Sequence, residues 1–442
     1  MILRSTRDPD SASTAATFSD AAERSLAPDG GLYLPDPLPR FADVDGLLAL
    51  DFRPRSQEIL DRLLGDEIPR ADLAAIVEDA FDFPVPLVRI ADRLFALELF
   101  HGPTLAFKDF GARFLARVLR RIAERRGDTA EGQPRTVLTA TSGDTGAAVA
   151  HAFWRVPGFR VVVLYPRGLV SPLQERQFAT LGDNVRALAV AGTFDDCQAL
   201  VKACFRDPEL EARHRFTSAN TINIARLVAQ VLYYFEAVAR LPRGAGAPVI
   251  SVPSGNFGNL CAGLMAGRLG LPVRAFVAAT NANTTVPEYL SGGEYRPRPS
   301  VATLSNAMDV GAPSNWERIE ALYSGDPEAL RRDLRWGSAG DEGTRAALRE
   351  LRDRGYVADP HAAVAYRVLT ERLEPGETGV FLATAHPAKF GEVLAPLGIE
   401  VPLPDALRRV ANRPFLAEPL PNDLDALRAA LDVDHLTGPP LG

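Results

Sequence analysis

Residues 95–115, FALELFHGPTLAFKDFGARFL, contain a complete strand–turn–helix unit that is repeated in outline along the chain. The first six residues are largely apolar and predict a strand over Phe95–Phe100, which His101-Gly102-Pro103 interrupts. From Leu105 onward apolar residues recur every three or four positions, which predicts a helix. Lys108 therefore lies in the first turn of a helix that follows a strand.

Short apolar runs followed by helix-length segments recur after this unit. The other runs expected to be strands are Thr136–Thr141, Phe159–Tyr165, Val185–Val190, Val249–Val252, Val273–Ala279 and Gly379–Thr384. Such alternation favours βα units around largely parallel sheets, whose ligands bind where the strands end. The charged segment 120–134 ends in glycine and proline and is expected to connect two domains.

Length and composition describe an ordinary globular chain. Its 442 residues suggest two or three domains, and a net charge of −7 argues against nonspecific binding to nucleic acid. Cys197, Cys204 and Cys261 lack CxxC spacing, so we expect reduced thiols rather than disulfides or a zinc site. The start has no apolar signal region, and no apolar stretch approaches the roughly 18 residues of a membrane helix. We therefore expect a soluble cytoplasmic protein without membrane partners.

Lysine is scarce, because only Lys108, Lys202 and Lys389 occur among 49 basic residues. Arginine can replace lysine in most ion pairs, but it cannot lose its proton at usable pH or form an imine with an aldehyde. A cation in the first turn of a helix is disfavoured by the helix dipole, which lowers the pKa of an amine there. These features predict covalent chemistry at Lys108, with biased codon usage as the alternative explanation of the scarcity.

A second strand–loop–helix unit contains Pro253-Ser254-Gly255-Asn256-Phe257-Gly258-Asn259. Glycines let backbone N–H groups converge, and the helix that follows adds partial positive charge, so the loop is suited to a phosphate. It matches neither the Walker A pattern nor GxGxxG, so a nucleoside triphosphate or a dinucleotide is not favoured. A tight turn without a ligand is the alternative.

Three further segments place polar groups at the ends of strands or the starts of helices. In Thr139–Gly146, hydroxyls and amides suit a carboxylate or phosphate, although plain N-capping explains the same residues. In Ser218–Arg226, an asparagine and an arginine share one helix face and could clamp an oxyanion, with a capped helix and a solvated arginine as the alternative. Thr384 ends a buried strand and could bond a ring nitrogen, while the roles of His386 and Lys389 stay open.

Six segments in this order resemble one enzyme family. They are HGPTLAFKDF (101–110), ATSGDTGAAVAHAF (140–153), SANTINIARL (218–227), VPSGNFGN (252–259), AMDVGAPSNWER (307–318) and ATAHPAKF (383–390), after an N-terminal LAPDGGLYLP (26–35). The set is similar to threonine synthases, which are fold type II, tryptophan-synthase-β-like pyridoxal-phosphate enzymes. The resemblance implies two open, mostly parallel, twisted α/β domains and an N-terminal helical element. The implied ranges are 1–92 for this element, 93–129 with 236–442 for the large cofactor-binding domain, and 130–235 for a smaller mobile domain.

The resemblance also implies residue roles, with pyridoxal 5′-phosphate as cofactor and no metal. Lys108 would form the Schiff base, and Thr384 would face the pyridine nitrogen. The residues implied to hold the cofactor phosphate are Gly255, Asn256, Phe257, Gly258 and Asn259. Those implied to bind the substrate carboxylate are Thr141, Ser142, Gly143, Asp144 and Thr145, and those implied to bind its phosphate are Thr145, Asn220, Thr221, Asn223 and Arg226.

The implied reaction converts O-phospho-L-homoserine and water into L-threonine and phosphate, in a monomer or, as the alternative, a dimer. One competing function is a lyase or deaminase that releases 2-oxobutyrate, and another is a noncatalytic scaffold that binds the cofactor. A nicotinamide oxidoreductase is disfavoured because the first strand is not followed by GxGxxG. One departure from the family is Thr284, where an aspartate is frequent. Asp359-Pro360-His361 resembles a family segment, and helix capping explains it.

Overall fold

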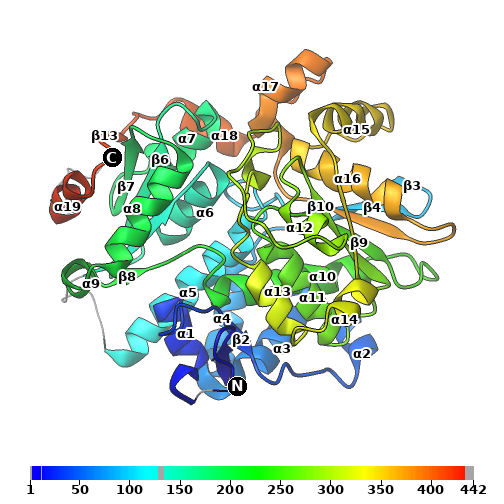
Figure 1. Ribbon diagram of the computed structural model, residues 1–442, viewed down its shortest axis with the longest axis horizontal. Coiled ribbons are helices and arrows are strands. Elements are labelled where there is room, and N and C mark those ends of the chain that lie inside the picture. Colours follow the sequence, from blue (N-terminus) through cyan, green and yellow to red (C-terminus); the bar gives the residue numbers. More distant parts are fainter. Residues whose placement is uncertain (1, 11, 128–133, 434–442) are drawn as a thin grey trace.

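The computed structural model describes residues 2–10, 12–127 and 134–433 (Figure 1). The N-terminal element joins an antiparallel pair of strands to helices at the bottom of Figure 1. Its elements are β1 (Leu3–Ser5), α1 (Phe18–Arg24), β2 (Tyr33–Pro35), α2 (Val44–Leu48), α3 (Phe52–Leu64) and α4 (Arg70–Ala80). None of the helices in the described ranges is both long and apolar enough to cross a membrane.

The larger sheet has six strands in the order β11-β10-β9-β12-β4-β3, and only the pair β3–β4 is antiparallel. Its strands are β3 (Leu87–Ala91), β4 (Leu94–Glu98), β9 (Val249–Pro253), β10 (Ala275–Thr280), β11 (Leu334–Ser338) and β12 (Gly379–Ala383). Phe95 and Leu97 point to one apolar cluster and Leu94 and Ala96 to another, so the sheet is buried on both faces. The covering helices are α5 (Lys108–Arg126), α10 (Ile224–Ala239), α11 (Gly258–Arg268), α13 (Trp316–Leu322) and α14 (Pro327–Asp333) on one side, and α15 (Asp341–Asp353) and α16 (Pro360–Arg372) on the other.

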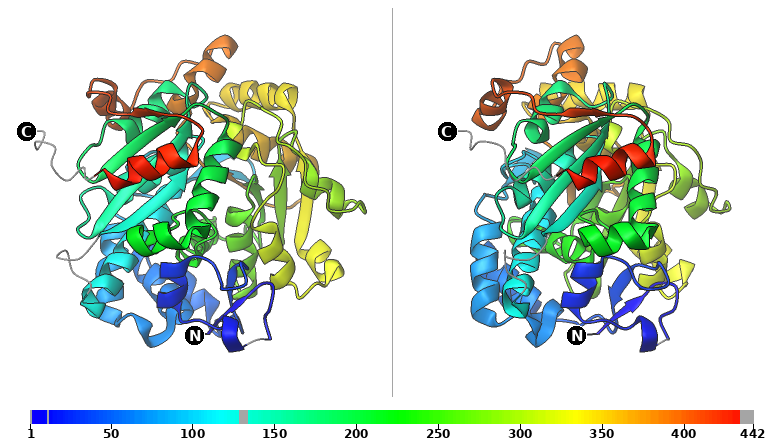
Figure 2. Two further views of the ribbon diagram at one scale, coloured as in Figure 1. Left: turned by 60° about the vertical axis from the view of Figure 1, so that its left-hand side comes forward. Right: turned by 90° about the vertical axis from the view of Figure 1, so that its left-hand side faces the viewer.

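The smaller sheet has five parallel strands in the order β13-β7-β6-β5-β8. Its strands are β5 (Arg135–Ala140), β6 (Phe159–Pro166), β7 (Val185–Val190), β8 (Phe216–Thr217) and β13 (Glu418–Leu420). Its helices are α6 (Asp144–Phe153) and α7 (Pro172–Ala179) on one face, and α8 (Phe194–Arg206), α9 (Pro208–His214) and α19 (Leu424–Asp432) on the other. Figure 2 shows α19, in red, beside the strands of this sheet.

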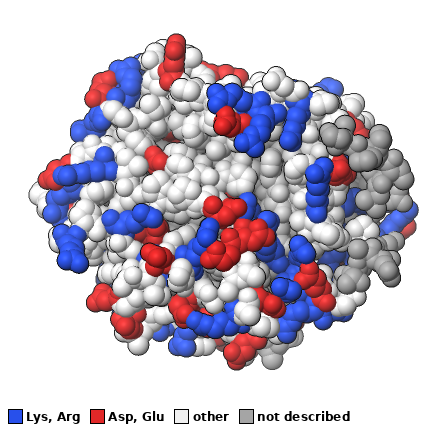
Figure 3. All heavy atoms as spheres, turned by 180° about the vertical axis from the view of Figure 1, so that it is seen from behind, with Lys and Arg blue, Asp and Glu red and all other residues white. Residues whose placement is uncertain are grey.

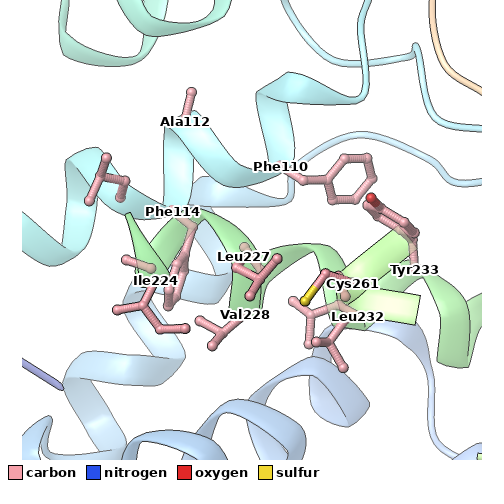
Figure 4. Packing of buried hydrophobic residues seen from close by; sticks show 14 of the residues in the cluster. Phe110, Ala112, Phe114, Ile224, Leu227, Val228, Leu232, Tyr233 and Cys261 are labelled. Atoms are coloured by element: carbon pink, nitrogen blue, oxygen red, sulfur yellow. The ribbon is translucent and has the colours of Figure 1, made fainter. Parts of the chain in front are cut away.

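Helices α5 and α10 pack against each other beneath the lysine turn (Figure 4). Phe110 and Phe114 from α5 lie among Leu227, Val228 and Tyr233 from α10, and all five are fully buried. The rings of Phe110 and Tyr233 meet edge to face with centroids 5.1 Å apart, a favoured aromatic geometry. This packing holds the start of α5, and with it Lys108, in a defined position.

Each predicted strand is present, with ends that differ by at most two residues. The segment 120–134 is not a simple connector, because α5 continues through Arg126, and residues 128–133 lie outside the described ranges. The range 236–442 is expected to belong to the large domain, but β13 pairs with β7 in the smaller sheet. Strand β3 likewise joins the larger sheet, although the helical element is expected to extend to residue 92.

Candidate active site

The turn after β4 presents Lys108 as the first residue of α5, as predicted. The Asp109 carboxylate holds the turn by accepting hydrogen bonds from the Thr104 N–H at 2.9 Å and the Thr104 hydroxyl at 2.7 Å. A Cβ atom on Gly102 would stand 2.5 Å from Asp109 Oδ2, so only glycine fits there. Burial raises the pKa of Asp109 to about 6. Asp109 thus serves the turn rather than the open part of the site.

Strand β12 ends next to this turn. The Phe107 N–H donates to the Thr384 carbonyl oxygen at 2.8 Å, which places Thr384 beside Lys108 in the fold. The Thr384 hydroxyl has no hydrogen-bond partner within residues 2–10, 12–127 and 134–433. Nearby, His386 Nδ1 accepts from the Ala388 N–H, and burial lowers the pKa of His386 to about 4. His386 is therefore a neutral capping residue at neutral pH.

The glycine loop connects β9 to the N-terminus of α11. A Cβ atom on Gly255 would lie 2.7 Å from Met308 Cα, and Phe257 adopts a left-handed φ of 59°. No described group accepts a hydrogen bond from the N–H groups of residues 255–259. An N-terminus with free N–H groups and partial positive charge is a site for an anion such as phosphate.

The two asparagines of this loop point in different directions. Asn256 is exposed, and its side-chain oxygen accepts from the Ser314 N–H and hydroxyl. Asn259 is buried, and its side-chain oxygen accepts from Tyr233 at 2.6 Å and Tyr234 at 2.7 Å. The buried Nδ2 atom of Asn259 has no partner among the described residues. The loop's available donors are therefore its backbone N–H groups and the Asn259 Nδ2 atom, while both asparagine side-chain oxygens already accept hydrogen bonds.

Helix α6 begins at Asp144, within the polar segment Thr139–Gly146. The Thr141 hydroxyl accepts from the N–H groups of Gly143 at 2.9 Å and Gly146 at 2.8 Å, so it organises the loop. Ser142 and Thr145 are half-buried, and neither hydroxyl bonds to another described residue. These two hydroxyls are the loop's free polar groups.

Asp144 does not point toward solvent. Its Oδ1 atom accepts from Lys389 Nζ at 2.8 Å and from Gln174 Nε2 at 2.8 Å, and its Oδ2 atom lies 4.0 Å from Lys108 Nζ. Burial acts to raise the pKa of Asp144, but the two ammonium groups outweigh burial and lower the pKa. Lys389 and Gln174 were not identified as site residues, because nothing in the sequence links them to a carboxylate so distant along the chain.

The segment before α10 lies across the site, but its polar residues have different partners. Asn220 accepts from the Thr139 hydroxyl at 3.2 Å, and Thr221 accepts from Asn315 Nδ2 at 3.1 Å. Asn223 is fully buried, and its Nδ2 donates to Ala22, Ser25 and Ser218 while its Oδ1 caps α10. Asn223 thus ties α10 to the N-terminal element, and it has no free donor for the predicted phosphate.

Arg226 is buried rather than solvated, with 1% of its surface exposed. It donates to the carbonyl oxygen of Ala219 and, at 3.5 Å, to that of Lys108, while its Nε has no partner among the described residues. Burial lowers the pKa of Arg226 to about 10, so it is a cation at neutral pH. The guanidinium therefore supplies positive charge directly behind the lysine turn.

The Asp359–His361 segment behaves as the sequence predicts. Asp359 Oδ1 caps α16 by accepting from the His361 and Ala362 N–H groups, and Pro360 occupies the first turn. Thr284 bonds Glu288 at 2.6 Å and has no part in the described site.

The chain thus offers a half-buried amine and an anion-binding helix start, two groups that suit an aldehyde carrying a phosphate. The family profile described as "Pyridoxal-phosphate dependent enzyme" matches residues 83–385, which contain both features. The fold and the site thus define a pyridoxal-phosphate-dependent enzyme. Two further profiles match its ends, "Threonine synthase N terminus" at residues 3–81 and "Threonine synthase, C-terminal" at residues 362–431.

Comparison with individual proteins narrows the assignment from pyridoxal-phosphate-dependent enzymes in general to one family. The chain is 52% identical to threonine synthase from Serratia marcescens, over 94% of this chain and 96% of that protein. The crystal structure of threonine synthase from Escherichia coli superposes with a TM-score of 0.91 at 50% identity, covering 98% of this chain and 99% of that one. A PLP-bound threonine synthase from Brucella melitensis gives a TM-score of 0.90 at 35% identity, covering 99% of this chain and 100% of that one. The chain belongs to the threonine synthase family, and it is a pyridoxal-phosphate-dependent lyase.

A more distant likeness concerns the fold alone. Threonine deaminase isoform 2 from Solanum lycopersicum superposes with a TM-score of 0.56 at 16% identity, over 81% of this chain and 90% of that one.

The family profiles and the threonine synthase relatives confirm the expected fold class, cofactor and enzyme family. The roles of individual residues stay predictions.

Proposed function

We propose that Lys108 is the catalytic residue of this threonine synthase and that O-phospho-L-homoserine is its substrate. Pyridoxal phosphate, when bound, supplies an electron sink for charge that develops on the substrate carbons. The observation that carries the proposal is the position of Lys108, a half-buried amine between the end of β12 and the start of α6. Burial lowers the pKa of Lys108 although Asp144 opposes the shift, and a base needs its neutral form.

In the proposed reaction, Lys108 Nζ removes the proton from the substrate Cα. A proton then leaves Cβ, the bond between Cγ and the phosphate oxygen breaks, and Cγ gains a proton. Water adds its hydroxyl to Cβ, and Lys108 returns a proton to Cα, so that threonine and phosphate are formed. Lys108 is the only group to which we assign a proton transfer.

We propose that the substrate is held at its two anionic ends. The free hydroxyls of Ser142 and Thr145 at the start of α6 would bind the carboxylate. Asn220 and Thr221 would bind the phosphate, and the Arg226 cation would stabilise the charge on the leaving group. Asn223 is left out of this set because its amide is fully hydrogen-bonded elsewhere.

Cofactor binding is proposed for the glycine loop and Thr384. The N–H groups of residues 255–259 would hold the phosphate, and the Thr384 hydroxyl would face the ring nitrogen. A neutral hydroxyl does not enforce a protonated ring as a carboxylate would. We further propose that the unit around the smaller sheet moves to exclude water when the substrate binds.

The test is a product balance with the purified, cofactor-loaded enzyme. O-phospho-L-homoserine is supplied, and phosphate, threonine and 2-oxobutyrate are measured together. Equal amounts of phosphate and threonine are expected. Phosphate with 2-oxobutyrate would instead support the lyase function, and no phosphate would leave only cofactor binding.

A further inference from the structure

The Asp144 carboxylate lies between a fully buried lysine, Lys389, and a half-buried one, Lys108. Lys389 Nζ donates to its Oδ1 atom at 2.8 Å, and Lys108 Nζ is 4.0 Å from its Oδ2 atom. The Lys389 side chain is 0% exposed and the Lys108 side chain 15% exposed, against 3% for Asp144. One carboxylate is therefore shared unequally by two amines, and Lys389 is the closer and more deeply buried partner.

This cluster joins elements of both sheets. Asp144 begins α6 beside the smaller sheet, and Lys389 lies in a 3-10 helix, η4 (Pro387–Phe390), that follows β12 of the larger sheet. Gln174 of α7 also donates to Asp144, and Gln177 of the same helix donates to the Thr104 carbonyl oxygen at 3.1 Å. The carboxylate is thus held in place by groups other than Lys108.

Most ion pairs among the described residues have at least one exposed side chain, unlike the Asp144–Lys389 pair. Basic and acidic side chains are interspersed over the face in Figure 3, and solvent screens such exposed pairs strongly. A buried charge has no such screening, so it must be paired or neutral. Two ammonium groups sharing one carboxylate inside the protein leave an excess positive charge. Lys108 is the more distant amine and makes no hydrogen bond to Asp144, so its positive charge is less stabilised by the carboxylate than that of Lys389.

Charged groups act on Lys108 from four other elements. They are Asp144 from α6, Lys389 from η4, Arg226 from α10 and Asp359 at the start of α16. The carboxyl of Asp109, on the same helix as Lys108, is bonded to Thr104 instead. Burial lowers the pKa of Lys108 most, Asp144 raises it, and Lys389 and Arg226 lower it further. Lys389 therefore acts on Lys108 as a like charge and as a competitor for the same carboxylate.

We propose that Lys389 is a positioning residue that occupies Asp144 and thereby keeps a usable fraction of Lys108 as the neutral amine at physiological pH. The neutral amine is the form that attacks an aldehyde and the form that accepts a proton. The inference rests on the proposed catalytic role of Lys108. It assigns a function to the second lysine of the site and to the buried pair that joins the two sheets.

The scarcity of lysine makes a direct test possible. The full-length chain, labelled with ¹³C at lysine Cε and freed of cofactor, should give three Cε resonances, which Lys202→Arg and Lys389→Arg assign. The Lys108 resonance is followed through a pH titration. In the wild type we expect its midpoint below the usual lysine value of about 10.4. A midpoint at or above that value would overturn the proposal.

Substitutions at Lys389 distinguish the effect of its charge on the Lys108 midpoint from the effect of its side-chain size. Lys389→Gln retains a donor for Asp144 but removes the charge, so the Lys108 midpoint should rise by about one pH unit or more. Lys389→Arg retains the charge and should leave the midpoint near the wild-type value. Lys202→Gln, at an exposed position on α8, is the matched control and should leave it unchanged. An unchanged or lower midpoint in Lys389→Gln would contradict the proposal.

Uptake of pyridoxal phosphate gives a second readout. At pH 7.5 the Lys389→Gln chain should show a slower rise of the lysine-bound absorbance, by up to about tenfold for each pH unit by which the Lys108 midpoint has risen. The rates should converge at high pH, where the amine is neutral in both proteins. Slower uptake at every pH would indicate a purely structural role and overturn the proposal.

A charge-balanced pair of variants covers the case in which Lys389→Gln does not fold. Asp144→Asn with Lys389→Gln removes both charges of the buried Asp144–Lys389 pair, and it is compared with Asp144→Asn alone. The double variant should have the higher Lys108 midpoint, by about one unit, because a like charge has been removed. Equal midpoints would overturn the proposal. Because the titration needs no cofactor, its failure is distinct from a failure of Lys108 to bind the cofactor.

Discussion

Replacing Gly255 by alanine tests how closely the glycine loop approaches the chain around Met308. The φ angle of Gly255 is not in the left-handed region, so the effect of the added methyl is steric. The methyl would stand 2.7 Å from Met308 Cα and 3.1 Å from the Ala307 carbonyl oxygen, both backbone atoms. That segment is anchored, because the Ala307 N–H donates to His361 Nε2 at 3.2 Å. Overpacking of this kind costs about 1–3 kcal/mol.

This free energy can reduce either the stability of the folded chain or its affinity for the cofactor. If the loop keeps its place, the free energy of unfolding of the cofactor-free chain should drop by about 1–3 kcal/mol. If the loop relaxes outward, the same free energy is lost on binding, and the affinity for pyridoxal phosphate should fall about five- to 150-fold. Urea unfolding and an absorbance titration with the cofactor measure the two quantities.

Gly343→Ala is the matched control. Gly343 lies within α15, where a methyl would make an ordinary contact of 3.6 Å with Ala339 Cβ. Alanine should leave cofactor affinity unchanged there and stabilise the helix by up to about 1 kcal/mol. If Gly255→Ala matched this control in both stability and affinity, the close approach inferred for the loop would be wrong.

Four other substitutions give distinct results. The buried Asp109 has its pKa raised from 3.8 to about 6, so the folded protein binds the extra proton, and this contribution to stability should fall by about 3 kcal/mol as pH rises from about 3 to about 7. Asp109→Asn should remove this dependence in thermal unfolding, and an unchanged slope would refute the assignment. Asn223→Ala should lower the free energy of unfolding in urea by about 2–4 kcal/mol, because several buried hydrogen bonds are lost. Asn220→Ala should instead mainly raise KM for O-phospho-L-homoserine. The reverse pattern would mean that Asn223 binds the substrate and Asn220 stabilises the fold. Thr384→Val should shift the absorbance of the bound cofactor and lower kcat while unfolding changes by less than about 1 kcal/mol, and an unaltered spectrum would place the ring nitrogen elsewhere.

Local patterns in the sequence predicted much of the fold and the centre of the site. The apolar runs gave the strands because strands buried on both faces are nearly continuous apolar segments. Lys108 at the start of α5 and the glycine loop at the start of α11 follow from local turn and helix signals. These features depend on residues that are close together along the chain.

The remaining features depend on tertiary contacts. Asp144 and Lys389 are 245 positions apart, and no local pattern indicates that their side chains meet. Asn223 has the residue type of an oxyanion ligand, but packing of α10 on the N-terminal element turns its amide toward Ala22 and Ser25. Strand β13 has three residues, too few for a clear apolar pattern, so its place in the smaller sheet was missed.

The most direct test of the central claim is to locate the cofactor on the chain. The enzyme loaded with pyridoxal phosphate is reduced with borohydride and digested, and its lysine peptides are analysed by mass spectrometry. We expect the reduced pyridoxyl group on Lys108 and on no other lysine. A label on Lys389, or no stable label after reduction, would contradict the assignment of Lys108 as the covalent and catalytic residue.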